Sequence, residues 1–322
     1  MITLFHATLF MTLLLVAGIG YVLVRFVPII ERNAFEVPRY QMPQSYEPPP
    51  SLKMQRLNIP YDTKSVVEAC YIPNTSGQAS VHSRETSKRL VVFCHETGAD
   101  MNSWYRHAHF LPEDGVDVLA FNFKPRPIKQ SKHVEDTFYQ WPSFRELKVL
   151  ERVLSWVAAE KEDFEVALFG VSKGATVAIA AAPSPLIRSV LLDGAFSTHL
   201  TMSQYMKKWV NIYVSSKKVA RQIPNGIYIF LSYATLVYAS FRKHVQFFSI
   251  EHFITRLRKP VFWIHAGKDY HVRLEHVEFL RRRIPGTTDL WVAEKAGHSD
   301  AVDIYPHEYR SKIVNFLGKT LA

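Results

Sequence analysis

The chain has 322 residues, 48% of them hydrophobic and 13% aromatic, and a formal net charge of +10. These values exclude a disordered or fibrous protein and fit one large globular domain with an additional segment. The two cysteines, Cys70 and Cys94, have no metal-ligand spacing, and the sequence implies no metal or organic cofactor. The basic residues form no recognised nucleic-acid-binding module, so nucleic acid is not an expected partner.

Residues 2–24 contain no Asp, Glu, Lys or Arg. As a helix they would extend roughly 35 Å, which is enough to cross the hydrocarbon core of a bilayer. Residues 1–25 are therefore predicted to form a single-pass transmembrane anchor, with membrane lipid as a partner. A cleaved secretory signal is the main alternative, but its usual basic amino-terminal region and a clear small-x-small cleavage site are missing. A buried helix of a soluble protein would need a large core to receive so uniformly apolar a surface.

The composition changes after this span. Arg25, Arg32 and Arg39 favour a location in the cytoplasm for the chain that follows the span. A domain of this length can be translocated regardless of flanking charge, so the sequence does not determine on which side of the membrane the domain lies. Residues 37–50 contain five prolines and few aliphatic side chains. Residues 26–50 are therefore predicted to form an extended tether, followed by a catalytic domain over residues 51–322.

The predicted elements of this domain alternate between strands and helices. An opening antiparallel pair is expected, and after it short apolar runs of the buried-strand type alternate with amphipathic helical segments. This alternation predicts an α/β fold with a mostly parallel sheet flanked by helices. The expected strands are 52–59, 65–72, 90–94, 116–121, 165–169, 189–192, 261–265 and 289–292, and the expected helices include 143–161, 274–284 and 309–317.

The pentapeptide Gly170-Val171-Ser172-Lys173-Gly174 joins one of these strands to a helix-forming run. A strand that enters a helix through Gly-x-Ser-x-Gly makes a tight turn, in which the serine adopts strained backbone angles and exposes its hydroxyl. The flanking glycines let strand and helix approach closely because they have no Cβ. Ser172 is therefore the predicted nucleophile, and the backbone N–H of Lys173 is predicted to face a developing oxyanion.

A serine needs a base to accept its proton and an acid to orient that base. Asp269 and His298 each follow a predicted strand through a short glycine-containing loop. The order Ser172, Asp269, His298 is that of the α/β-hydrolase triad. Asp193 is the second-ranked acid. Alternatively, Asp269 would cap a helix and His298 would be a loop histidine bonded to Asp300.

The loop after the strand 90–94 reads His95-Glu96-Thr97-Gly98, and with the motifs above it makes the chain resemble the α/β-hydrolase superfamily over residues 51–322. The resemblance is to acyl-ester hydrolases, acyl-thioester hydrolases and serine-aminopeptidase-like members. It implies that Thr97 contributes the second oxyanion N–H. Glu96 stands where a glycine is usual in the family, and Gly98 is the residue that would take up the resulting strain. His95 is expected to be a structural histidine that bonds to neighbouring backbone.

Residues 196–258 form a longer connection than one crossover helix requires, which predicts a helical lid. No acidic residue lies between Asp193 and Glu251, whereas seven lysines and arginines do. The most apolar part of the insertion would either line an acyl pocket, rest in the bilayer interface, or pack as an ordinary buried stripe. Its apolar side chains are Ile227, Phe230, Leu231, Leu236, Val237 and Phe241.

These features predict a membrane-anchored serine hydrolase that cleaves carboxylic ester or thioester bonds of an acylated, lipid-like substrate. A serine-aminopeptidase-like peptidase is a second hypothesis, although it would need an acidic group near the cleft to receive a substrate amine. A non-catalytic, membrane-tethered binding protein on a hydrolase fold is the third, and it is motivated by Glu96.

Overall fold

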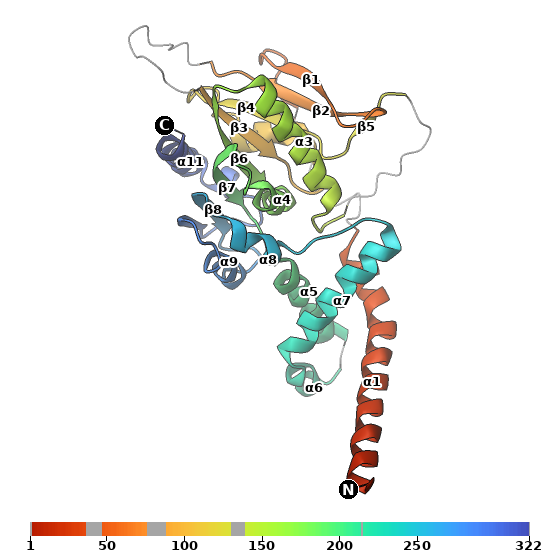
Figure 1. Ribbon diagram of the computed structural model, residues 1–322. Coiled ribbons are helices and arrows are strands. Elements are labelled where there is room, and N and C mark those ends of the chain that lie inside the picture. Colours follow the sequence, from red (N-terminus) through yellow and green to blue (C-terminus); the bar gives the residue numbers. More distant parts are fainter. Residues whose placement is uncertain (1, 37–46, 76–87, 130–138, 214, 322) are drawn as a thin grey trace.

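The computed structural model describes residues 2–36, 47–75, 88–129, 139–213 and 215–321, so residues 37–46 of the predicted tether lie outside the described residues. A nine-stranded sheet forms the centre of the molecule, in the order β1-β2-β4-β3-β6-β7-β8-β9 with β5 paired to β2 (Figure 1). The strands are β1 (Gln55–Pro60), β2 (Ser65–Ile72), β3 (Lys88–Cys94), β4 (Asp117–Phe121), β5 (Arg126–Pro127), β6 (Phe164–Val171), β7 (Ile187–Asp193), β8 (Val261–Ala266) and β9 (Thr288–Ala293).

The sheet is antiparallel at one edge, where β2 pairs with β1, β4 and β5, and parallel from β4 to β9. The parallel strands are apolar on both faces because helices cover both. In β3, Val92 packs into the core on one face, and Val91 and Phe93 pack into the core on the other. The chain leaves β3 for β4 on one side and later returns to β6 on the other. The strand order therefore reverses beside β3, and in open α/β sheets ligands bind at the carboxyl ends of the strands at such a reversal.

Helices α3 (Phe144–Glu160) and α4 (Lys173–Ala181) cover one face, and α2 (Trp104–Ala108) and α11 (Pro306–Thr320) cover the other. The start of α3 is fixed by a capping box in which Ser143 and Glu146 satisfy each other's backbone N–H groups. The short helix α10 (Ala301–Ile304) and helix α9 (Leu274–Arg281) complete the layers. The expected helices at 143–161, 274–284 and 309–317 are thus present with small shifts of their ends.

The insertion between β7 and β8 is helical, as predicted, and consists of α5 (Thr198–Tyr213), α6 (Lys217–Gln222) and α7 (Asn225–Lys243), followed by α8 (Ile250–Phe253). The last part of this insertion, before β8, packs on the domain. Helix α8 packs on α4, and Ile250 and Ile254 are fully buried in the main core. The projecting part of the insertion is therefore α5–α7 (Figure 1).

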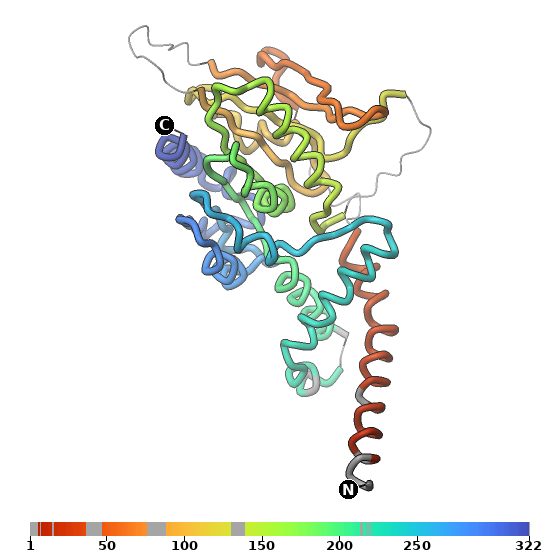
Figure 2. Tube along the Cα trace, viewed as in Figure 1, coloured from red at the N-terminus to blue at the C-terminus, as the bar shows by residue number. Residues whose placement is uncertain are grey.

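Helix α1 runs from Ile2 to Ala34 without interruption, so the part of the predicted tether that covers residues 26–34 is helical instead. The cause is tertiary packing: the last turns of α1 meet the α/β domain, where Phe35 is fully buried in an edge-to-face contact with Phe247. Trp141 Nε1 donates a 2.7 Å hydrogen bond to the Ala34 carbonyl. The earlier part of α1 projects away from the domain (Figure 2). Within α1, the segment Thr8–Ala34 contains an 18-residue stretch with a mean hydropathy of 2.3 and meets the length and composition expected of a membrane-spanning helix.

Candidate active site

Ser172 lies in the tight turn between β6 and α4, at the carboxyl edge of the sheet. Its backbone angles are φ 51° and ψ −116°, a strained conformation for a residue with a Cβ. Both flanking glycines are required sterically. A Cβ at Gly170 would lie 2.4 Å from the Ala175 Cα, and a Cβ at Gly174 would lie 2.1 Å from the Cys94 carbonyl oxygen. The sequence therefore folds into the predicted elbow because only glycine fits on either side of it.

The three residues predicted from their order in the chain meet at one point. His298 Nε2 lies 2.9 Å from Ser172 Oγ, and His298 Nδ1 lies 2.5 Å from Asp269 Oδ2. The imidazole side chain is 29% exposed while the Asp269 side chain is fully buried. A substrate can therefore approach the serine and the histidine from solvent, and the aspartate is shielded behind them.

The two carboxylate oxygens of Asp269 have different partners. Its Oδ1 accepts the backbone N–H groups of His271 and Val272, and its Oδ2 faces His298. Helix α9 begins later, at Leu274, so Asp269 orders the preceding turn and does not cap the helix. These two backbone bonds leave the second oxygen aimed at the imidazole.

The electrostatics favour a charged pair. Burial alone would raise the pKa of Asp269, but the hydrogen bond and charge of His298 outweigh it, together with the two backbone donors, and the pKa is lowered. Burial alone would lower the pKa of His298, but the hydrogen bond and charge of Asp269 reverse the direction, with help from Asp193 and Asp300, and the pKa is raised. Such a pair stabilises the imidazolium that forms when the histidine accepts a proton.

Asp193, the second-ranked acid, has a different environment. Its carboxylate accepts a 2.8 Å hydrogen bond from the Tyr309 hydroxyl, and its carbonyl accepts the Ser172 N–H at 2.7 Å. Burial raises the pKa of Asp193. The next residue, Gly194, has φ +67° and lies directly beneath the imidazole, since a Cβ there would be 3.1 Å from His298 Cε1. Asp193 thus supports the elbow from below, and Asp269 is the acid that contacts the histidine.

The loop after β3 packs directly against the elbow, because the Cys94 and His95 carbonyls are the atoms closest to Gly174. This contact brings the start of the loop that carries Thr97 against the first turn of α4. The N–H of Lys173, the first residue of α4, belongs to the first turn of the helix, whose N–H groups have no partner within the helix. Gly98 adopts φ +78°, whereas Glu96 is not among the positive-φ residues of the described chain. The left-handed turn therefore falls on Gly98, and a side chain is tolerated at position 96.

Glu96 turns into the protein. Its Oε2 accepts a 2.6 Å hydrogen bond from Ser103, and its Oε1 lies 3.8 Å from His107 Nε2, a distance typical of an ion pair and too long for a hydrogen bond. Burial would raise the pKa of Glu96, but His107 and Ser103 lower it to about 2. His107 is fully buried and stacks on Phe93. The Glu96 carboxylate thus links the loop after β3 to the interior.

The side chains of His95 and Lys173 have structural partners. His95 Nδ1 lies 2.8 Å from the Glu96 carbonyl, and the Phe123 N–H reaches His95 Nε2 at 3.3 Å, so the ring is neutral with its proton on Nδ1. His95 therefore has the structural role expected of it. Lys173 Nζ pairs with Glu146 Oε1 at 2.5 Å, which fastens the elbow to the start of α3.

Tyr205 connects the insertion to the site. The Tyr205 hydroxyl accepts a 2.8 Å bond from Gln140 Nε2 and lies 3.2 Å from His271 Nδ1. The His271 ring is in an edge-on contact with the His298 ring, with centroids 6.4 Å apart. Burial raises the pKa of Tyr205 to about 12. Helix α5 therefore reaches the rim of the site through this hydroxyl.

Four further residues reach the site and could not be predicted from the sequence: Ser103, His107, Tyr205 and Gln140. None of them has a local signal, since each reaches the site through contacts with residues from other elements. The position of Ser103 seven residues after Glu96 becomes meaningful only when the 3₁₀ turn at Met101–Ser103 folds back on the loop.

No protein-family model matches the chain, and no curated protein sequence matches it. Among solved structures, the chain is similar to an esterase of Pyrococcus furiosus, with 19% identity and a TM-score of 0.61 over 90% of this chain and 99% of the esterase. It is similar to an acylaminoacyl peptidase of Pyrococcus horikoshii, with 12% identity and a TM-score of 0.54 over 84% of this chain and 42% of the peptidase. It is also similar to 2,6-dihydroxy-pseudo-oxynicotine hydrolase, with 14% identity and a TM-score of 0.52 over 85% of this chain and 69% of the hydrolase. At these identities the likeness establishes the fold, and the chain has the α/β-hydrolase fold.

Proposed function

We propose that this protein is a membrane-anchored serine hydrolase that cleaves carboxylic ester or thioester bonds of an acylated, lipid-like substrate. The observation that carries the proposal is the hydrogen-bonded chain from Ser172 Oγ through His298 to Asp269 on an α/β-hydrolase fold. The esterase, peptidase and hydrolase names of the similar structures support the same reaction class. The catalytic domain is assigned to residues 51–322, with the last turns of α1 packed against it.

In the proposed reaction, Ser172 Oγ attacks the acyl carbonyl while His298 Nε2 takes its proton, and Asp269 stabilises the imidazolium. The backbone N–H groups of Thr97 and Lys173 bind the oxyanion of the tetrahedral intermediate. His298 then returns the proton to the leaving alkoxide or thiolate, which departs and leaves an acyl-serine. A water molecule, deprotonated by the same imidazole, attacks the acyl-serine and releases the carboxylic acid.

The membrane anchor is proposed for α1. Besides its length and hydropathy, the support is that its last turns form part of the folded domain. Val27 and Ile30 belong to the main core, and Glu31 pairs with Lys243 of α7 at 2.7 Å. Removing α1 as a cleaved signal would also uncover Phe35 and its partners. Intact mass of the protein recovered from membranes tests this proposal, with retention of residues 2–36 as the expected result.

We prefer an ester or thioester substrate to a peptide with a free amino terminus. The amine of such a peptide would need a carboxylate near the cleft that is not already engaged. Glu251, the acid that follows the insertion, is already occupied. It accepts hydrogen bonds from Ser197, from the His199 N–H at 2.9 Å and from Ser249 at 2.8 Å. The hypothesis of a non-catalytic binding protein is weakened because the Glu96 carboxylate, which motivated it, is held by Ser103.

The test compares wild type with Ser172→Ala and with Ser311→Ala, a control on the exposed face of α11. A fluorophosphonate probe is expected to label wild type and S311A but not S172A, with equal thermal stability of all three. Labelling of S172A would refute the assignment of the nucleophile. The same proteins are then assayed with p-nitrophenyl acetate, palmitoyl-coenzyme A and alanine p-nitroanilide. Hydrolysis of the anilide alone would favour the peptidase, and no hydrolysis with no labelling would favour the binding protein.

A further inference from the structure

Helix α7 exposes a row of large apolar side chains. Ile227 is 44%, Phe230 48%, Val237 71% and Phe241 81% exposed. Their spacing of three and four residues places them on one side of the helix. Ten large hydrophobic residues outside α1 are exposed in the described chain, and five of them lie on α7, the fifth being Tyr233. We call Ile227, Phe230, Tyr233, Val237 and Phe241 the α7 stripe.

The α7 stripe is not the face that packs against the protein. That face carries Tyr228, Leu231, Leu236 and Ala239, which are buried in the main core cluster. Of the six apolar residues for which the sequence left three alternatives open, Leu231 and Leu236 are core residues and the other four are exposed. A contiguous exposed apolar surface of this kind marks an interaction site.

The position of α7 beside α1 indicates what covers the stripe. The two helices lie side by side in contact, and Lys243 near the end of α7 pairs with Glu31 near the end of α1 (Figure 1). Val22 and Leu23, inside the charge-free span of α1, are half-buried and pack against the same core cluster as α7. Contacts between the domain and α1 therefore extend into the segment proposed to cross the bilayer.

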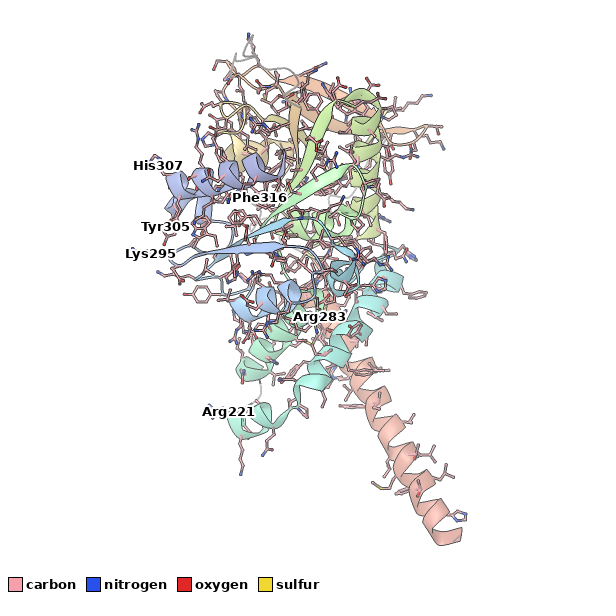
Figure 3. All side chains as sticks on the ribbon, turned by 60° about the vertical axis from the view of Figure 1, so that its left-hand side comes forward. Arg221, Arg283, Lys295, Tyr305, His307 and Phe316 are labelled. Carbon is pink, nitrogen blue, oxygen red and sulfur yellow. The ribbon has the colours of Figure 1, made fainter. Side chains whose placement is uncertain are left out.

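The charge pattern around α7 fits an anionic membrane surface. Residues 225–241 contain no charged side chain, and basic residues stand on both sides, at Arg221 and Arg242. Lys218 and Arg221 on α6 are exposed, and Arg221 projects at the tip of the insertion, away from the sheet (Figure 3). Exposed aromatic and aliphatic side chains on one side of a helix, with lysine and arginine at its ends, fit burial of that side in the membrane interface next to anionic lipid.

We propose that the α7 stripe is buried among the lipid acyl chains of the leaflet next to the catalytic domain. The proposal rests on the proposed function, because it requires α1 to span that bilayer. It also specifies where the proposed hydrolase meets its substrate. Helix α7 packs on α5, and α5 carries Tyr205 to the rim of the active site. An embedded α7 therefore holds the site against the membrane surface, so the substrates it receives are lipids resident in that leaflet.

The experiment uses the full-length protein in nanodiscs that contain one chain each. Both native cysteines are buried, so a cysteine introduced by Val237→Cys can be labelled selectively with bimane. Val24→Cys in α1 and Ser155→Cys on the exposed side of α3 are labelled in the same way as reference positions. Quenching by doxyl-labelled phosphatidylcholine reports contact with acyl chains, and quenching by iodide reports contact with water. Fluorophosphonate labelling of each variant shows that the active site is folded.

The expected result is strong doxyl quenching and weak iodide quenching at positions 237 and 24, with the opposite at position 155. Doxyl quenching at 24 combined with iodide quenching at 237 would overturn the inference and leave the anchor intact. Protection from both quenchers at 237 would also overturn it, because a second protein surface would then cover the stripe. Iodide quenching at both 237 and 24 would refute the anchor itself. The labelling and substrate assays report on the hydrolase independently of all these outcomes.

Discussion

Gly174→Ala is expected to damage the oxyanion hole while leaving the three side chains of the site in place. The added Cβ would lie 2.1 Å from the Cys94 carbonyl oxygen and 2.5 Å from the His95 carbonyl oxygen. Since favourable contacts between heavy atoms begin at about 3.5 Å, the closer contact is too short by about 1.4 Å. Both obstacles are backbone atoms, so no side-chain rotation relieves the clash. The main chain of the oxyanion loop must move, and Thr97 moves with it.

The size of the effect follows from this displacement. A misplacement of about 1 Å at a reacting centre costs about 10²-fold in rate, and loss of one oxyanion donor costs about 10² to 10³ in kcat. Gly174→Ala should therefore lower kcat by a factor of about 10² to 10³ with a small change in KM, since the oxyanion forms only on the way to the intermediate. Overpacking should also reduce the free energy of unfolding by about 1–3 kcal/mol.

The assay is steady-state hydrolysis of p-nitrophenyl acetate by purified protein in detergent, with thermal unfolding measured in parallel. Gly318→Ala is the matched control because it makes the same chemical change in helix α11, where a Cβ would have no atom within 4 Å. It should keep wild-type activity and gain about 0.5–1 kcal/mol of stability. If folded Gly174→Ala had the kcat of Gly318→Ala, the oxyanion loop would not depend on this contact and the reasoning would be refuted.

Three further predictions concern charged groups. Asp269→Asn should lower kcat/KM by about 10⁴ at neutral pH. Because Asp269 raises the pKa of His298, the acidic limb of the pH–rate profile should also move to lower pH in this variant. An unchanged midpoint of that limb would contradict the prediction. The pKa of Glu96 is lowered from 4.5 to about 2, so its charge should stabilise wild type over Glu96→Gln by about 3 kcal/mol above pH 4.5. Chemical denaturation should show this difference disappearing as the pH falls towards 2, and a difference independent of pH would count against the lowered pKa of Glu96. Lys243→Ala leaves Glu31 buried without its cation. The free energy of unfolding in detergent should therefore fall by about 3–5 kcal/mol. An unchanged free energy of unfolding would show that this pair does not hold α1 on α7.

The local sequence was sufficient to predict a structural feature wherever that feature depends on residues close together in the chain. The elbow at Ser172 could be predicted because the steric demand for Gly170 and Gly174 arises from residues next to them in the chain and from the strand-to-helix turn itself. The strand positions could be predicted because a strand covered on both faces must be apolar along its length. The order of Ser172, Asp269 and His298 along the chain was also sufficient to predict that these three would meet.

Long-range packing decided the remaining features. The sequence offered Asp193 and Asp269 as acids, and only the fold shows that Tyr309 takes the first while His298 contacts the second. Helix α1 continues past its apolar span because Phe35, which follows it, packs against residues far along the chain such as Phe247. The prolines that follow residue 37 favoured an extended tether, and nothing in the sequence indicated this packing.

The tight turn at Ser172, the strand positions of the sheet and the apolar character of α1 and α7 can be predicted from the chain alone, because they depend on neighbouring residues and on composition. The direction of Glu96 inward to Ser103 and of Phe230, Val237 and Phe241 outward depends on the folded structure. The direction of a side chain depends on which elements, often distant in the sequence, lie beside that side chain in the fold. An apolar residue favours burial, but its identity does not specify whether protein or lipid buries it.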